Sequence, residues 1–106
     1  MPAREPRLSV YVHDLIAWGR VRGGGRNMRW THMIADTLDE LHAMAAAIGM
    51  KRAWFQGPPK HRDAHYDLTP RRRAAAVHLG AIECDRRTFV SHMRRLRGLP
   101  PRPGTP

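Results

Sequence analysis

Two short segments of the sequence bring together residue types that carry acid–base chemistry. The first runs from His32 to Asp36, and the second is HYD at residues 65–67. A histidine can serve as a general base or acid, and a neighbouring aspartate can orient its imidazole ring. The predicted catalytic residues are His32, Asp36, His65 and Asp67, and the predicted neighbours in the same pocket are His42 and Tyr66.

The same residues could hold a divalent metal, the one cofactor that the sequence suggests. His61 and His65 are separated by three residues, and Asp67 and Asp36 can complete a set of imidazole and carboxylate ligands. Such a set is of the open, catalytic kind, because closed structural zinc sites rely on cysteine. The metal candidates are therefore His61, His65 and Asp67. The competing interpretation is an ordinary solvated histidine in a proline-flanked loop.

Structural roles compete with each chemical one. Asp67 can form a turn or cap the helix that follows, while Tyr66 can pack its ring in the core and bond its hydroxyl to a neighbour. His42 lies at the edge of an apolar stripe, where a histidine commonly makes one structural hydrogen bond. Asp36 can share a helix cap with Thr37.

The chain carries a formal charge of +10, from 19 Lys and Arg against 9 Asp and Glu. Arginine supplies nearly all the cations, and residues 68–106 hold most of the excess. A basic surface attracts polyanions, because its cations release counterions from the phosphate backbone. The predicted contacts to nucleic acid or another phosphorylated partner are Arg71, Arg72, Arg73, Arg87, Arg94 and Arg95. The alternative is that codon usage in a GC-rich genome accounts for the arginines.

Four strands and three helices are expected to position these residues. Apolar and β-branched runs predict strands at residues 8–12, 30–35, 50–55 and 81–84. Helices are predicted after three capping residues, Thr37, Thr69 and Asp85, and Glu40 completes a capping box with Thr37 by bonding the cap amide. Gly49 and Gly80 are predicted to end the first two helices.

This order, ββαβαβα, predicts a small α/β domain with a sheet of about four, mainly parallel, strands. In a parallel sheet the carboxyl ends of the strands share one edge, where ligands bind. Asp36 and the HYD segment are therefore expected at the same rim.

A length of 106 residues fits one domain. We expect a flexible N-terminus at 1–7, the domain at 8–97 with a Gly- and Arg-rich loop at 19–29, and a Pro-rich tail at 98–106. The single cysteine, Cys84, and an N-terminus without an apolar run predict a cytoplasmic protein. No apolar run is long enough to span a membrane, and the oligomeric state is left open.

The segment THMIADTLDELHAMAAAIG, followed by HYDL and an arginine-bearing helix, resembles a small bacterial and phage family known only as a domain of unknown function. The family pattern combines H-x-x-[AS]-D-T, an E-L-H helix, a W-F strand and H-Y-D. The resemblance runs from about Tyr11 to Leu96 and departs from the pattern at 19–29, which is longer and richer in glycine. It implies the limits of the fold and the choice of candidate residues, and it brings no established activity.

Three hypotheses follow from the sequence. The leading one is a domain that binds nucleic acid or another phosphorylated partner through its arginines, which predicts steep salt dependence. The second is a hydrolase-like enzyme with a His/Asp pocket, in which Asp36→Asn or Asp67→Asn abolishes activity without unfolding. The third is a protein-interaction module that uses the Pro-rich tail.

Overall fold

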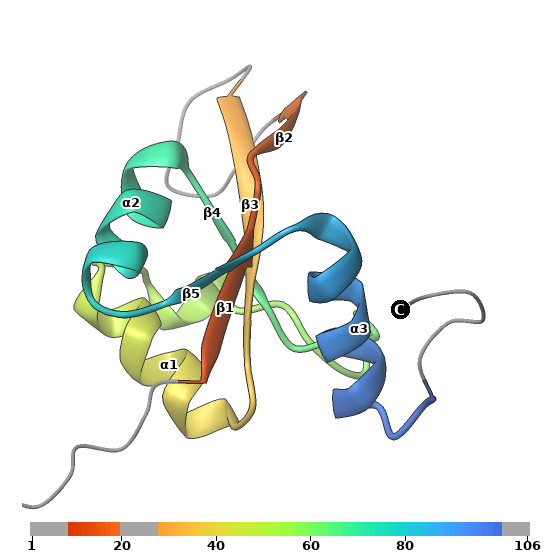
Figure 1. Ribbon diagram of the computed structural model, residues 1–106. Helices are drawn as coiled ribbons and strands as arrows, with labels where there is room; N and C mark the ends of the chain where they lie inside the picture. Colours follow the sequence, from red (N-terminus) through yellow and green to blue (C-terminus); the bar gives the residue numbers. More distant parts are fainter. Residues whose placement is uncertain (1–8, 20–27, 101–106) are drawn as a thin grey trace, which may run out of the picture.

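The computed structural model describes residues 9–19 and 28–100, which form one α/β domain (Figure 1). Its elements are β1 (Val10–His13), β2 (Ile16–Gly19), β3 (Met28–Ala35), α1 (Leu38–Ala47), the 3-10 helix η1 (Arg52–Trp54), β4 (Tyr66–Leu68), α2 (Pro70–His78), β5 (Ile82–Cys84) and α3 (Arg86–Leu96). The expected N-terminus at 1–7, most of the 19–29 loop and the end of the tail lie outside the described residues. No helix in the described part of the chain has the length and apolar character to cross a bilayer.

The sheet is mixed, and β3 is its central strand. β1 and β2 pair antiparallel with β3 one after the other, β4 pairs antiparallel with β3, and β5 adds to β1 in parallel. The prediction of a mainly parallel sheet is therefore wrong, since β1–β5 is the one parallel pair among the described strands. The reason is that the described residues between β1 and β3 contain no helix, and short connections join antiparallel strands.

The predicted element order is also wrong in two places. A strand at 16–19 is added, and the strand expected at 50–55 is replaced by a loop and η1, while the segment YDL at 66–68 forms β4 instead. Two adjacent exposed cations, Lys51 and Arg52, break the alternation that a half-buried strand needs. Trp54 and Phe55 still pack against the core from this segment.

All three predicted helices form, with the predicted caps. The side chains of Thr37, Thr69 and Asp85 accept the amides of Glu40, Arg72 and Thr88, respectively. Pro70 follows Thr69 at the first helical position, and Gly49 and Gly80 have the positive φ that favours glycine after a helix. One detail differs: the Glu40 carboxylate accepts the amide of Ser9 and the hydroxyl of Thr37, and thereby fastens the chain before β1 to α1.

The sheet has helices on both faces, α1 and α2 on one and α3 on the other (Figure 1). The face toward α1 and α2 carries the main core, which includes Val10, Val12, Met33, Leu41, Tyr66 and Leu68. The face toward α3 carries a smaller cluster of Tyr11, Ile34, Cys84 and Phe89, with Met93 packed against it. His13 and His32 lie on this second face, beside Phe89.

Candidate metal centre

Strand alternation brings His32, His65 and Asp67 together on the α3 face of the sheet. His32 lies directly opposite Asp67 in the pairing of β3 with β4. His65 precedes β4 and forms a bridge with Gln56 through two backbone hydrogen bonds. Because successive strand residues point to opposite faces, His65 and Asp67 share one face and Tyr66 points to the other. The spacing of the H-Y-D motif thus follows from the pleat of the strand.

The three side chains form a compact group, which we call the donor cluster (His32, His65 and Asp67). Each offers one ligand atom, and these atoms lie within 4.8 Å of one another. Asp67 Oδ1 is 3.5 Å from His65 Nε2 and 3.9 Å from His32 Nε2. Tetrahedral zinc at ordinary bond lengths holds its ligand atoms about 3.3 Å apart. Small side-chain rotations would bring the cluster to that geometry.

Asp67 is held by one carboxylate oxygen only. Its Oδ2 accepts a hydrogen bond from Gln56 Nε2 at 2.7 Å. Among the described residues, Asp67 Oδ1 is the buried side-chain oxygen without a hydrogen-bond partner. Leaving a buried acceptor unsatisfied costs about 1–3 kcal/mol, and more when it is charged. An oxygen of this kind, aimed at two imidazoles, is suited to a cation.

His13 determines which nitrogen of His32 carries the proton. His13 Nδ1 lies 2.6 Å from the carbonyl oxygen of Asp14, to which it must donate. His13 Nε2 is then an acceptor, and it accepts the backbone N–H of His32 at 3.0 Å. His32 Nδ1 lies 3.0 Å from the same Nε2, so it too must donate. In neutral His32 the remaining nitrogen, Nε2, therefore presents a lone pair to Asp67.

His65 is oriented in the same way. Its Nδ1 lies 2.8 Å from the carbonyl oxygen of Asp63 and must donate to it, which leaves Nε2 directed toward Asp67. Ligating histidines characteristically donate their other ring N–H to a carbonyl or another acceptor. Both imidazoles of the donor cluster therefore have the outer hydrogen bonds expected of metal ligands.

Burial keeps His32 neutral. The loss of hydration lowers the pKa of His32 to about 4, and the carboxylate of Asp67 only partly opposes this effect. Burial also lowers the pKa of His13, and the positive charge of Arg86 acts in the same direction on both histidines. Aromatic rings surround the pair, with Trp30 edge-on to His32 and Phe89 edge-on to His13. At neutral pH, His32 is thus a lone-pair donor in an apolar setting.

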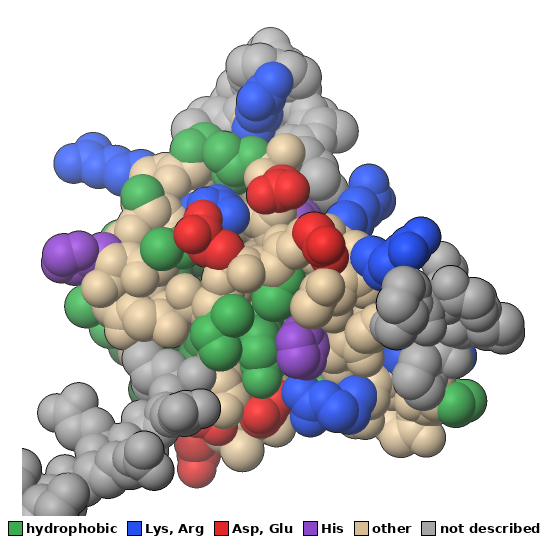
Figure 2. All heavy atoms as spheres, in the orientation of Figure 1, with side chains coloured by type: hydrophobic (Ala, Val, Ile, Leu, Met, Phe, Trp, Pro, Cys, Tyr) green, Lys and Arg blue, Asp and Glu red, His purple; other side chains and the backbone are tan. Residues whose placement is uncertain are grey.

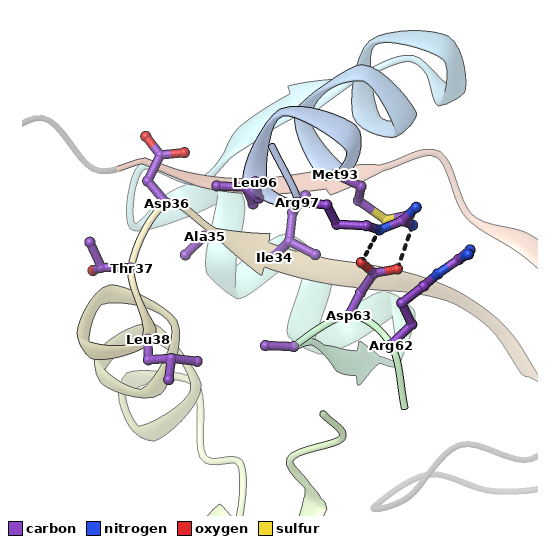
Figure 3. Close-up of a pocket in the computed structure, with 11 residues that line it drawn as sticks. Ile34, Ala35, Asp36, Thr37, Leu38, Arg62, Asp63, Met93, Leu96 and Arg97 are labelled. Atoms are coloured by element: carbon purple, nitrogen blue, oxygen red, sulfur yellow. Dashed lines mark hydrogen bonds and ion pairs between the residues drawn. The ribbon is translucent and has the colours of Figure 1, made fainter. Parts of the chain in front are cut away.

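A cavity opens beside the donor cluster. It is lined by His32, His65, His61, Arg62, Asp63 and Met93. The His61 ring stands edge-on to the His65 ring, with centroids 5.8 Å apart, but His61 is not among the three grouped donors. Arg97, at the end of α3, donates two hydrogen bonds of 2.6 and 2.8 Å to the Asp63 carboxylate (Figure 3). These bonds connect the end of α3 to the segment that carries His65.

The structure holds Asp36 away from the donor cluster. Asp36 follows β3, four residues beyond His32, and pairs with Arg95 at 2.9 Å and with the Tyr11 hydroxyl at 3.4 Å. Burial raises the pKa of Asp36, but the hydrogen bond and charge of Arg95 more than offset this and lower it. The shared rim expected from a parallel sheet is absent from the described strands, because β3 and β4 run in opposite directions.

His42 and Tyr66 lie on the opposite face of the sheet. The Tyr66 hydroxyl is 2.9 Å from His42 Nδ1, and the His42 ring stands edge-on to Phe55. Tyr66 is fully buried. This pair fits the structural alternative, in which the two side chains form a hydrogen bond with each other at the edge of the main core.

A protein-family model described as a protein of unknown function, DUF4031, matches residues 10–96. The chain belongs to this family. The match includes β1 through α3, and therefore His13 and the whole donor cluster. No curated protein and no solved structure matches the chain. The family's description supplies no reaction, so a function has to be inferred from the geometry of the site.

The predicted phosphate-binding arginines do not form one surface within this family domain. Arg73 donates to the His13 carbonyl at 2.8 Å and pairs with Glu83, while Arg94 donates to the Pro100 carbonyl. Arg95 pairs with Asp36, whereas Arg71 and Arg87 are exposed. Figure 2 shows Lys and Arg side chains at separate places around one face of the molecule, with acidic side chains between them.

Sequence reasoning missed two residues that organise the centre. His13 ends β1 and supports His32, and Gln56 holds Asp67. The alternation of Tyr11 and His13 with the apolar Val10 and Val12 was a usable signal, since it places His13 on the same face as Tyr11. Gln56 gave no such signal, because its role depends on a bridge between two segments of irregular sequence.

Proposed function

We propose that the donor cluster binds a divalent transition metal and that the protein is a metal-dependent hydrolase of phosphate esters. The observation that carries the proposal is the convergence of two imidazole Nε2 atoms on a buried carboxylate oxygen that has no hydrogen-bond partner. Two nitrogen ligands and one oxygen ligand favour metals such as zinc or cobalt over calcium and magnesium, which prefer oxygen.

Three protein ligands leave coordination positions for water and substrate, as in catalytic zinc sites. A metal in such a site lowers the pKa of its bound water and polarises a phosphoryl oxygen. Hydrolysis forms the bond from the water oxygen to phosphorus and breaks the ester P–O bond. One water proton passes to the leaving oxygen, and we assign its transfer to His61, a titratable side chain in the lining of the cavity.

The charge around the cavity supports an anionic substrate. Arg62 is exposed and lines the cavity, and Arg86 is close enough for its charge to lower the pKa of His32. Asp63, the acidic group in the lining, is already neutralised by Arg97. The cavity therefore offers a phosphate uncompensated positive charge in addition to the metal.

The test combines metal analysis with turnover. Purified protein is loaded with Zn²⁺, Co²⁺ or Mn²⁺ and assayed on p-nitrophenyl phosphate and bis-p-nitrophenyl phosphate. Wild type and the exposed control His78→Ala should bind one metal per chain and turn over substrate, whereas His32→Ala, His65→Ala and Asp67→Asn should do neither. Turnover that survives a chelator, or that these three variants retain, would reject the proposal.

A second candidate function is binding of single-stranded nucleic acid at a surface around Trp54. Lys51 lies over the Trp54 ring at 5.5 Å and Arg72 at 5.3 Å, while Arg52 lies over Phe55 at 4.9 Å. Cations grouped with aromatic rings are the usual combination for strands that are held by phosphate contacts and stacking. Of the predicted arginines, Arg72 belongs to this surface. Arg71, the exposed residue before it in α2, is included in the test, and Arg73 is excluded because it bonds the His13 carbonyl.

Its test is fluorescence anisotropy with labelled single-stranded DNA and RNA across a salt series. Lys51→Ala/Arg52→Ala/Arg71→Ala should weaken binding and reduce the salt slope by roughly 0.7 for each phosphate that the variant no longer neutralises. The control is Arg87→Ala, an exposed arginine on α3. Equal affinities and slopes for the triple variant and the wild type would remove this candidate.

A further inference from the structure

A second cavity lies next to the cavity at the donor cluster. The two share Arg62, Asp63 and Met93 in their lining. From there the second cavity runs between the end of α3 and the start of α1 (Figure 3). We call it the α1–α3 groove, and its apolar lining consists of Ile34, Ala35, Leu38, Ala64, Met93 and Leu96.

The groove and the donor cluster lie along the same face of β3. His32 and Ile34 lie on that face, and Asp36 follows β3 on the same side, where it pairs with Arg95 of α3. A strand rises about 3.3 Å per residue. Ile34 therefore lies about 7 Å from His32, and Asp36 about 13 Å, measured along the strand. A phosphate at the donor cluster with one compact organic group attached would span a distance in this range, about 7 to 13 Å.

Two apolar side chains on the groove remain exposed. Leu38 at the start of α1 is 54% exposed and Leu96 at the end of α3 is 40% exposed. Figure 3 shows them on different helices, with Ile34 on the strand between. A flat apolar group placed in the groove would cover both side chains and remove apolar surface from water.

The charges along the groove are asymmetric. Arg62 stands at the end shared with the donor-cluster cavity. At the far end lie Asp36 and the first turn of α1, which carries Asp39 and Glu40. Arg95 offsets the charge of Asp36, and Arg97, the second cation in the lining, is paired with Asp63 and is therefore not available to a further phosphate. A ligand with its negative charge at one end only is therefore favoured over a polymer with phosphates along its length.

We propose that the α1–α3 groove binds the organic arm of the substrate, and that the substrate is a phosphate monoester with one flat apolar arm of aryl size. This inference rests on the proposed function, since the phosphate is assigned to the metal at the donor cluster. Leu38 and Leu96 contact the arm, and Arg62 contacts the phosphate.

The test compares two non-hydrolysable probes that differ only in the arm, methylphosphonate and phenylphosphonate. Their affinities are measured by calorimetry on Zn²⁺-loaded and metal-free protein, with the methyl signals of Leu38 and Leu96 followed by NMR. Phenylphosphonate should bind about tenfold more tightly, as partial burial of one ring predicts. Leu38→Ser/Leu96→Ser should remove this preference, and Leu79→Ser, an exposed leucine on α2's C-terminal side, should keep it.

The outcomes separate the groove from the metal. Equal affinities for the two probes, a preference that survives in Leu38→Ser/Leu96→Ser, or no binding of phenylphosphonate at millimolar concentration would overturn the groove assignment. A preference for phenylphosphonate that is lost in the double variant supports the groove even if Zn²⁺ changes neither affinity. In that last case the proposal of a metal-dependent function is rejected, and the assignment of the groove is still supported.

Discussion

The two faces of the central sheet use the same strands for different purposes. Toward α1 and α2, strand residues such as Met33, Tyr66 and Leu68 are almost fully buried and nearly all apolar. Toward α3, the same strands present His13, His32 and Asp67 beside a smaller apolar cluster. Side chains on a strand alternate between the two faces. One residue therefore packs in the main core, and the next one points to the face that carries the candidate site.

This difference separates stability from chemistry. The apolar face lowers the free energy of the folded state mainly by burying apolar side chains. The polar face places a carboxylate oxygen with no hydrogen-bond partner beside two imidazole nitrogens, an arrangement that costs stability in the metal-free protein. Sites that break the rules of core packing in this way are where function is expected.

The largest effect should come from substitutions that compare the two faces at nearly adjacent positions. Leu68→Ala should lower the free energy of unfolding by about 2–5 kcal/mol, because Leu68 is fully buried and leaves a cavity. His65→Ala should cost less than about 1 kcal/mol, since it removes one net hydrogen bond. Urea unfolding of metal-free protein measures both. Similar losses at the two positions would contradict the division between faces.

Metal binding should stabilise the fold through the polar face alone. Zn²⁺ at 100 times its Kd should add about 2.7 kcal/mol to the stability of the wild type, because the folded state alone assembles the site. Thermal unfolding with Zn²⁺, Mn²⁺ or Ca²⁺ measures this effect, and Ca²⁺ should add little. His65→Ala should abolish the stabilisation and His78→Ala should preserve it. Stabilisation that persists in His65→Ala would place the metal elsewhere.

His13 should control metal affinity without binding metal. His13→Leu removes the acceptor for His32 Nδ1 and should weaken Zn²⁺ binding by about 10–100-fold. His13→Gln should recover most of the affinity, because its amide can accept from His32 and donate to Asp14. Nitrogen NMR of His32 should show the proton on Nδ1 in wild type and His13→Gln, and on Nε2 in His13→Leu. A proton on Nε2 in the wild type would refute the positioning role.

Local sequence signals predicted the helices well. The caps at Thr37, Thr69 and Asp85 depend on residues a few positions apart, so their chemistry can be read from the chain directly. Strand 30–35 and the alternation of His32 with Ile34 were also predictable from the pattern. These features require no knowledge of what lies on the other side of the sheet.

Features that depend on distant contacts were not predictable. The segment 50–55 has strand-like residues, but its Trp54 and Phe55 pack beside α1 and α2 and leave the place next to β3 to β4. The direction of β4 then decided that His32, rather than Asp36, meets His65 and Asp67. Likewise, the PRRR segment gave no hint that Arg73 bonds the His13 carbonyl across the fold.

The smallest effect is the most informative about Asp67. If Asp67 is a metal ligand beside two neutral imidazoles, Asp67→Asn should stabilise the metal-free protein by about 1 kcal/mol, because an amide can donate to a histidine lone pair and still accept from Gln56. If instead Asp67 is the ion-pair partner of a protonated His65, the same substitution removes that attraction and destabilises the fold. Urea unfolding at neutral pH, with a chelator present, gives the sign directly. The double variant His65→Ala/Asp67→Asn completes a double-mutant cycle. If Asp67→Asn raises the free energy of unfolding, and raises it less when His65 is replaced by alanine, the carboxylate is assigned to the metal.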